Sequence, residues 1–299
     1  MAKDCDGILL IDKREDERST GVVERVKKAL KVRKIGHGGA LDPFASGLLL
    51  ILLGKGTKLF PFLLEYPKEY LFTLRLGIET DTLDCKGRVI DEKPIPSIDK
   101  DDIEKVLDYM KGEQVQIPPL FSAIKINGER AYRLVRKGRQ FELRERHISI
   151  YDLKLIRWYS PTLSLWVRCS SGTYIRALGR DIAKRLGSIG HLISLRRISI
   201  GPFNVQHAID SLDIERMEQS HLRERIIPLR RSLPHLEEIK ISQDLADKII
   251  SGNQAALNRL TLKAQRDDKV KLISNDRLIG IIRAIPASKG ITYSIMRIF

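Results

Sequence analysis

The sequence predicts an α+β protein in which a large domain of strands and helices precedes a small β domain. Three observations support this fold class. The 299 residues, 42% of them hydrophobic, are enough for one large core and a second small one. Up to about residue 235, strand-like runs are interspersed with helical periodicity. Beyond it, short strand-like runs are separated by turn residues and preceded by one short helix near residues 244–250.

The first elements are expected to be a buried strand and a helix. Residues 7–12 are mainly apolar, as in a buried strand, and residues 13–18 are all charged and predict a turn. Ser19 or Thr20 is expected to cap a helix that continues to about Lys31, because apolar residues recur there at helical spacing.

A glycine-rich stretch at residues 34–48 is the feature on which the interpretation of function depends. It contains four glycines, one proline and a single carboxylate, Asp42. Glycine permits positive φ and close approach of a ligand, whereas Pro43 favours extended geometry at the residue before it. Asp42 is therefore either a presented functional group or a solvated turn residue. Residues 54–58 lack the spacing of a P-loop, so nucleotide hydrolysis is not predicted.

The middle of the chain contains further elements and candidate polar groups. Strands are expected at residues 70–76, 147–158 and 162–169, and helices at residues 101–112 and 175–186. Asp81 and Asp84 either pair with Asp42 or act in caps and turns, and local bonding to the backbone favours the second role. Tyr174 and Arg176 either meet at one site or are a core tyrosine and a solvated arginine.

The charge of the chain favours a polyanionic partner. The net charge is +15 and the pI is about 9.7, so nucleic acid is the first expectation. Residues 117–147 carry eight Lys or Arg against three Glu, and residues 168–200 carry seven against one Asp. Both segments are candidate phosphate-contacting surfaces, and ordinary solvated helix faces are the alternative.

Several other classes of protein are not expected. The apolar runs are too short to span a bilayer, and acids occur where a signal peptide would need a basic and then an apolar stretch. Three widely spaced cysteines fit reduced thiols in a cytoplasmic protein. No paired histidine spacing indicates a metal site.

Six separated motifs occur in one order along the chain. They are the opening strand at residues 7–13, the glycine-rich stretch at 34–48 with 54–58 after it, the Thr-Asp-Thr-x-Asp-x-x-Gly loop within 77–87, the basic segment 116–138, Cys-Ser-x-Gly-Thr-Tyr-Ile-Arg at 169–176, and residues 195–203. Together they resemble bacterial TruB-type tRNA pseudouridine synthases. The departures are a charged turn at 14–18 in place of Pro-x-Gly, Gly38 where threonine is frequent, and Ser171 where lysine is frequent.

The resemblance implies a pseudouridine synthase fold, with a mixed, largely antiparallel sheet flanked by helices over residues 1–235. It also implies a thumb-like RNA-binding insertion at about 117–147, and a β-barrel-like PUA domain that binds RNA at 236–299. The implied reaction is isomerisation of uridine 55 in the T loop of tRNA to pseudouridine, after base flipping and without a metal or organic cofactor. The implied partner is the tRNA T stem-loop, with no membrane, no obligate protein partner and a monomeric enzyme.

The resemblance also assigns roles to individual residues. Asp42 matches the catalytic aspartate, which attacks C1′ or C6 or acts on the sugar through a glycal, and the sequence leaves these routes open. Arg176 matches the arginine that pairs with it, and Tyr70 the aromatic that stacks on the flipped base. Tyr174 shares the pocket and helps to move a proton. The residues expected to contact RNA or line the pocket are His37, Lys58, Leu195, Lys125 and Arg136.

Two alternatives come from other classes of protein. A catalytically idle RNA-binding or tRNA-folding protein on the same fold would use the same basic segments. A pure binder needs no carboxylate in the path of an anionic ligand, so Asp42 favours the enzyme. A DNA-binding protein is not supported, because helix-turn-helix and zinc-finger spacings are missing from the sequence.

Overall fold

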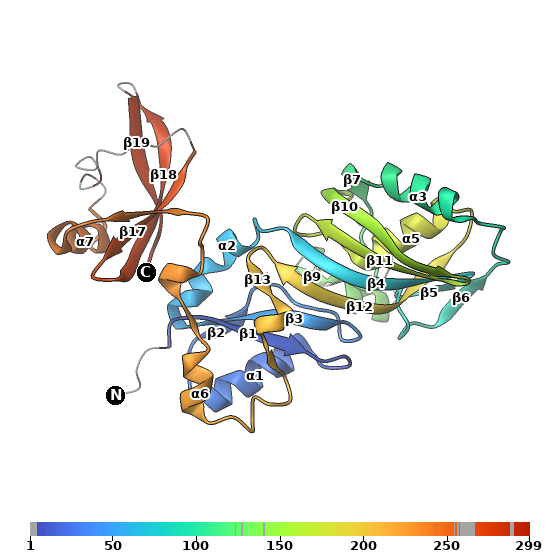
Figure 1. The fold of residues 1–299 in the computed structure, drawn as a ribbon, viewed down its shortest axis with the longest axis horizontal. Helices are drawn as coiled ribbons and strands as arrows, with labels where there is room; N and C mark the ends of the chain where they lie inside the picture. Colours follow the sequence, from blue (N-terminus) through green and yellow to red (C-terminus); the bar gives the residue numbers. More distant parts are fainter. Residues whose placement is uncertain are drawn as a thin grey trace.

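The computed structural model describes residues 5–122, 124–126, 128–139, 141–253, 255, 257, 267–287 and 290–299. Its main feature is an 11-stranded sheet in the order β14-β1-β3-β12-β4-β11-β10-β7, with β13, β15 and β2 paired beside it (Figure 1). The pairs are antiparallel except β1 with β14 and β12 with β3. The expected α+β fold with a mixed, largely antiparallel sheet is therefore confirmed.

The strands of this sheet are β1 (Gly7–Lys13), β2 (Ile35–His37), β3 (Ser46–Leu53), β4 (Lys68–Leu76), β7 (Gly112–Gln116), β10 (Arg146–Tyr159), β11 (Thr162–Cys169), β12 (Gly190–Ile200), β13 (Phe203–Asn204), β14 (Ile209–Asp210) and β15 (Ile227–Pro228). Two small hairpins are formed by β5 (Ile78–Thr80) with β6 (Val89–Glu92), and by β8 (Lys125–Ile126) with β9 (Glu129–Arg130). The helices are α1 (Ser19–Leu30), α2 (Phe60–Leu63), α3 (Lys100–Tyr109), α4 (Ala131–Arg136), α5 (Ile175–Arg185), α6 (Gln219–Glu224) and α7 (Gln243–Ile250). Short 3-10 helices are η1 (Gly54–Leu59), η2 (Val205–His207) and η3 (Leu229–Arg231).

The pattern of each strand follows from what covers its two faces. All eight residues of β3 are buried, because one face packs on α1 and the other on α2 and the C-terminal part. This double cover explains why β3 is a continuous apolar run rather than an alternating one. In β4, by contrast, Tyr70, Phe72, Leu74 and Leu76 alternate with more exposed residues.

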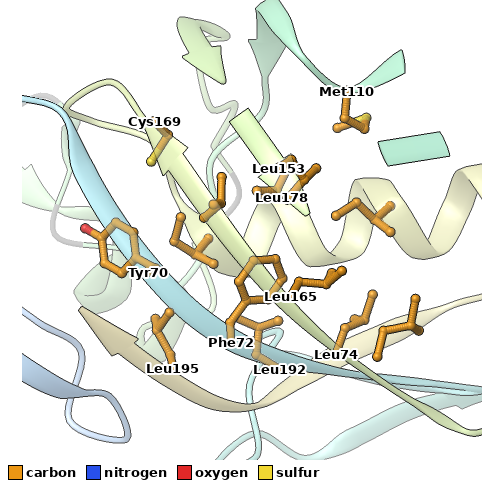
Figure 2. Close-up of a cluster of buried hydrophobic side chains, with 14 of the residues drawn as sticks. Tyr70, Phe72, Leu74, Met110, Leu153, Leu165, Cys169, Leu178, Leu192 and Leu195 are labelled. Atoms are coloured by element: carbon orange, nitrogen blue, oxygen red, sulfur yellow. The ribbon is translucent and has the colours of Figure 1, made fainter. Parts of the chain in front are cut away.

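The largest core lies between α3 and α5 and one face of the strands β4, β11, β10 and β12 (Figure 2). It is built from alternate residues of the strands, such as Phe72 and Leu165, and from helical residues such as Leu178. This core supports the first turn of α5 beside Tyr70, the region where the candidate site is found.

The C-terminal part is a separate sheet in the order β16-β17-β18-β19, with α7 beside it (Figure 1). Its strands are β16 (Glu237–Lys240), β17 (Lys269–Ser274), β18 (Arg277–Ala287) and β19 (Gly290–Ile298). The sequence predicted three of these strands but not β16, which pairs in parallel with β17. The described strands form an open sheet, with β16 and β19 at its edges, so a barrel-like closure is not seen among them.

The C-terminal sheet packs directly against the main part. Leu233, Ile281 and Phe299 share one core with residues of β3 and α2. Around that core, the Glu65 carboxylate pairs with Lys269 at 2.5 Å, and the Tyr66 hydroxyl is 2.7 Å from Nδ1 of His235.

Two local expectations near the N-terminus were wrong. Ser19 does not cap α1, because Arg18 occupies the N-cap position without a side-chain bond. The Ser19 hydroxyl instead donates to the Leu41 carbonyl and accepts from the Leu41 N–H, both at 2.9 Å. Lys13 is not part of a charged turn but ends β1 and is fully buried. Both side chains are used to hold residues of the glycine-rich stretch.

Two expected RNA contacts lie partly outside what the structure describes. The backbones of Lys125 and Arg136 are in β8 and α4, but their side chains are not among the described atoms. Within the described residues, no helix is both long and apolar enough to cross a bilayer.

Candidate active site

Asp42 lies in the loop that joins β2 to β3, and this loop is held by groups from distant parts of the chain. Ser19 bonds both polar groups of the Leu41 backbone. Arg197 on β12, only 2% exposed, donates to the Leu48 carbonyl at 2.7 Å and to the Gly39 carbonyl at 2.9 Å. Because both anchors bond to main-chain atoms, they fix the path of the loop as well as its side chains.

Gly47 explains how β3 approaches Arg197 so closely. Its φ is +102°, and a Cβ there would lie 2.2 Å from the Arg197 carbonyl oxygen. A side chain is therefore excluded by conformation and by space. This glycine of the motif serves packing against β12, rather than the approach of a ligand.

Lys13 is a second internal cation below the loop. Its ammonium donates to the carbonyls of Arg14 (2.8 Å), Glu17 (2.9 Å) and Pro43 (3.3 Å). Burial lowers the pKa of Lys13 to about 8, although the charges of Glu17 and Asp42 oppose this shift. The bond to Pro43 ties β1 to the residue that directly follows Asp42.

Arg176, in the first turn of α5, connects Asp42 to two other segments, the loop of Thr82 and Asp84 and the segment of Phe121. Its Nε donates to Oδ2 of Asp42 at 2.9 Å, Nη1 donates to the Thr82 carbonyl at 2.7 Å, and Nη2 to the Phe121 carbonyl at 3.0 Å. Nη1 is also 3.4 Å from Oδ2 of Asp84. The Arg176 side chain is 4% exposed and the Asp42 side chain 38%, so a buried guanidinium holds a carboxylate that still reaches solvent.

Asp84 stabilises a turn in the polar loop that follows β4. Its carboxylate accepts from the Thr82 hydroxyl at 2.8 Å and from the Lys86 N–H at 3.0 Å, as expected for a turn residue. It does not pair with Asp42 directly. Both carboxylates instead approach the same guanidinium, and Asp84 is 9% exposed.

Tyr70 and Leu195 come from neighbouring strands of the sheet and lie at the edge of the large core (Figure 2). The Tyr70 hydroxyl points away from the aliphatic side chains of that core. Burial raises the pKa of Tyr70, and the Arg197 guanidinium beside it opposes the shift. The Asp42 charge raises the pKa further.

Tyr174 is the N-cap residue of α5, two positions before Arg176. Burial raises the pKa of its phenol, and the charges of Asp42 and Arg176 act on it in opposite directions. The buried Ser122 hydroxyl lies close to the Tyr174 phenol and lowers its pKa. Among the described residues, this hydroxyl has no hydrogen bond of good geometry. Asp42, Tyr70, Tyr174 and Arg176 thus surround one place, at the start of α5.

His37 ends β2, before the loop of Asp42, and Lys58 lies in η1, after β3. Burial and the Arg197 charge lower the pKa of His37, which favours the neutral form of its ring. Lys58 donates to the Ile298 carbonyl of the C-terminal sheet at 2.8 Å. Burial and the nearby cations Lys34, Lys55 and Arg297 lower its pKa, so Lys58 belongs to a basic patch shared by both parts of the protein.

The segment 168–200 presents less basic surface than its composition suggested. Arg176 and Arg197 are buried and bonded to the interior. Arg196 forms a bidentate pair with Asp12, and Arg185 stacks on the Tyr109 ring with 3.7 Å to its centroid. The expectation of a phosphate-binding surface was wrong for the two buried arginines, because main-chain carbonyls and Asp42 are their partners.

Sequence reasoning missed three residues that shape this site: Lys13, Gln116 and Arg197. All three lie within the motifs that carry the resemblance, and this was the available signal. Their partners are mostly backbone atoms, which have no signature in a sequence. Among the described residues, no group of three or more His, Cys, Asp or Glu side chains is arranged to hold a metal ion.

Comparison with known proteins agrees with this geometry. Residues 27–175 match the family described as TruB family pseudouridylate synthase (N terminal domain), and residues 176–234 match the tRNA pseudouridylate synthase B C-terminal domain. The tRNA pseudouridine synthase B of Chromohalobacter salexigens is 36% identical over 93% of this chain and 90% of the relative. That of Clostridium kluyveri is 38% identical over 92% of this chain and 94% of the relative.

Solved structures show the same fold. The crystal structure of a Cbf5-Nop10-Gar1 complex contains a chain that superposes with a TM-score of 0.72 at 25% identity, covering 98% of this chain and 84% of that one. The family matches and the fold define the class: this is a pseudouridylate synthase. Within that class, the chain belongs to the TruB family.

Proposed function

We propose that this protein isomerises uridine 55 in the T loop of tRNA to pseudouridine. The reaction breaks the bond between C1′ and N1, turns the base and forms a bond between C1′ and C5. The proton on C5 leaves to solvent and N1 takes up a proton, so atoms balance. The proposal draws on the family and on the relatives named tRNA pseudouridine synthase B. The observation that carries it is the Asp42 carboxylate, held at 2.9 Å by the buried Arg176 yet 38% exposed.

In this proposal Asp42 is the catalytic carboxylate and Arg176 orients it. Attack at C1′, attack at C6 and a route through a glycal all require this acid at the flipped nucleotide. Arg176 is suited to its role because a guanidinium donates in fixed directions and three of its other contacts hold it in place. The base itself is extracted from a folded loop, so the site must replace the stacking that the base loses.

Tyr70 and Tyr174 supply the remaining groups. Tyr70 stacks on the flipped uracil, a contact worth about 1–3 kcal/mol, and Leu195 beside it extends the apolar wall. Because burial raises the pKa of Tyr174, its phenol keeps its proton at neutral pH and can exchange it with the base in the closed site. His37, with its neutral ring, contacts RNA as a hydrogen-bonding group.

We further propose that residues 1–235 form the catalytic domain and residues 236–299 a PUA-like RNA-binding domain. The basic patch of Lys34, Lys55, Lys58 and Arg297 supports this, because it joins residues of the main part to one of β19. Phosphates of the same tRNA can lie across both parts at such a patch. Residues 117–147 act as the thumb on the other side of the T stem-loop, with Lys125 and Arg136 as contacts.

The test is Asp42→Asn, which keeps the shape of the side chain and removes its charge. An unmodified tRNA transcript carrying tritium at C5 of uridine reports the reaction by release of tritium, and sequencing maps pseudouridine to a single position. We expect wild type to modify uridine 55 alone and Asp42→Asn to release no tritium, while tRNA binding stays within about tenfold. Asp16→Asn is the matched control, because Asp16 lies in the turn near the loop but pairs with Lys86 in solvent.

The outcomes separate this function from its alternative. Turnover by Asp42→Asn at the wild-type rate would remove Asp42 from the mechanism. Tight tRNA binding by wild type with no tritium release would instead indicate a tRNA-binding protein on the same fold. Loss of activity in Asp16→Asn as well would show that any charge change near the loop is disruptive.

A further inference from the structure

Gln116 bonds the backbone of Tyr174 on both sides. It ends β7, at the other end of the sheet from β1, and is 2% exposed. Its Oε1 accepts from the Tyr174 N–H at 2.8 Å, and its Nε2 donates to the Tyr174 carbonyl at 3.2 Å. One side-chain amide therefore fixes the orientation of the peptide groups on either side of the Tyr174 Cα.

The bonds from Gln116 act where α5 lacks a cap of its own. Tyr174 is the N-cap residue, and its side chain makes no capping hydrogen bond. The first backbone N–H groups of a helix lack partners within the helix, so the position of such a terminus depends on outside contacts. The helix begins with Ile175, so Arg176 follows Tyr174 within the first turn. A displacement at Tyr174 would move both the phenol and the guanidinium.

The segment that begins with Gln116 accepts two more hydrogen bonds from α5. We call residues 116–122 the root segment, because they connect β7 to the basic insertion. Arg180 donates to the Ile117 carbonyl at 3.1 Å, and Arg176 donates to the Phe121 carbonyl at 3.0 Å. Gln116 thus belongs to a set of hydrogen bonds that joins the root segment to the start of α5, and one member of the set also holds Asp42.

We propose that Gln116 is a positioning residue for the isomerisation: it holds Tyr174 and Arg176 in register with Asp42 and couples them to the root of the thumb. The inference rests on the proposed function, because the reaction gives these residues their roles. RNA that contacts the thumb exerts a force on the root segment, and the hydrogen bonds to α5 transmit this force to Arg176. Loss of Gln116 then slows the chemical step and leaves tRNA affinity nearly unchanged.

The first test is Gln116→Met, which has a similar length but removes both hydrogen bonds. Gln114→Met is the matched control: Gln114 lies two residues earlier on β7, and its amide donates to the Tyr109 and Lys111 carbonyls rather than to the start of α5. Small errors of position cost up to about a hundredfold in rate. We expect single-turnover tritium release to fall at least about tenfold in Gln116→Met, with tRNA Kd within about threefold of wild type. A rate equal to that of Gln114→Met overturns the proposal.

Gln116→Glu provides a readout that a general loss of stability would not change. A protonated carboxyl group both accepts and donates, so it reproduces the two bonds of the amide. An ionised carboxylate cannot donate to the Tyr174 carbonyl, and burial raises the pKa at which it ionises. We expect the rate of Gln116→Glu relative to wild type to fall as the pH rises. A ratio that is independent of pH, at the level of Gln116→Met, contradicts the proposed pair of bonds.

Amide hydrogen exchange tests the arrangement without any turnover. The Tyr174 N–H is the donor to Gln116, and the Leu178 N–H donates to the Tyr174 carbonyl at 2.9 Å. We expect both amides to exchange faster in Gln116→Met than in Gln114→Met. Unchanged exchange overturns the positioning role even if the enzyme is active. An inactive wild type with this pattern of exchange would refute the proposed function and leave the structural coupling intact.

Discussion

Replacing Arg176 by methionine tests whether the site is held together by its buried cation. Methionine fills similar space but makes none of the contacts to Asp42, Thr82, Phe121 and Asp84. Breaking one side of a buried ion pair costs about 3–5 kcal/mol, because the remaining charge stays buried without its partner. Asp84, 9% exposed, is the carboxylate that would be left in this state.

The magnitude for Asp42 is expected to differ. Its side chain is 38% exposed, so water screens it and its pair with Arg176 contributes about 0–1 kcal/mol. Asp42→Asn should therefore unfold near the wild-type urea midpoint. Arg176→Met should lose about 1 M or more in midpoint, taking a slope of about 3 kcal/mol per M for a chain of this size. Both variants should be inactive, for different reasons.

The assay is urea unfolding followed by tryptophan fluorescence. The two tryptophans, Trp158 and Trp166, lie on β10 and β11, and Trp158 packs against the core that these strands share with α5 and α3. They report the part of the molecule that contains Arg176. Equal midpoints for Arg176→Met and Asp42→Asn would refute the reasoning, since the carbonyl and Asp84 contacts would then contribute nothing beyond the exposed pair.

Two further predictions concern the loop of Asp42. Gly47→Ala should lower both stability and activity, because the new Cβ would lie 2.2 Å from the Arg197 carbonyl oxygen and the φ of Gly47 is +102°. Gly21→Ala in α1 is the control: the space around Gly21 is open, so this change should stabilise the protein by up to about 1 kcal/mol. Thermal unfolding would show both effects on stability. Burial lowers the pKa of Lys13 to about 8, so above that pH this side chain binds fewer protons in the folded state than in the unfolded state. Lys13 should therefore contribute a rise in stability between about pH 8 and 10.5, as Lys68 does, whereas Cys169, with a pKa raised to about 12, acts in the opposite direction above about pH 9. Relative to Lys13→Met, the wild type should gain stability across this window, as urea unfolding at several pH values would show.

The sequence predicted several of the regular elements, because these carry a periodicity, but it gave no expectation for β7 or for the central strand β12. The strands β4, β10 and β11 and the helix α5 begin within one or two residues of the expected positions. β16 was missed because its four residues are three charged ones and a single isoleucine, and it pairs only at the edge of the C-terminal sheet. Here tertiary pairing decides the structure, and local preference does not.

The sequence did not show whether the cationic side chains of the site point into the protein or toward solvent. Lys13 stands in a charged run and Arg197 beside Arg196, so composition alone makes each a surface group. The fold turns both inward, because carbonyls of the glycine-rich loop lie where β1 and β12 pass β3. Carbonyl acceptors are present at every residue and therefore give no pattern to read. The basic excess of the chain is thus partly internal.

These internal cations matter for the role that we propose for Asp42. In the proposed reaction Asp42 approaches a polyanion, and its own charge repels the phosphates of the substrate. Lys13 and Arg197 hold the carbonyls on either side of Asp42, at Pro43 and Gly39, and Arg176 bonds the carboxylate itself. Each of these cations loses hydration on burial, and each recovers it through two or more hydrogen bonds. The result is a positive framework beneath one exposed acid, which lets the site keep that acid in place while the surface cations attract the RNA.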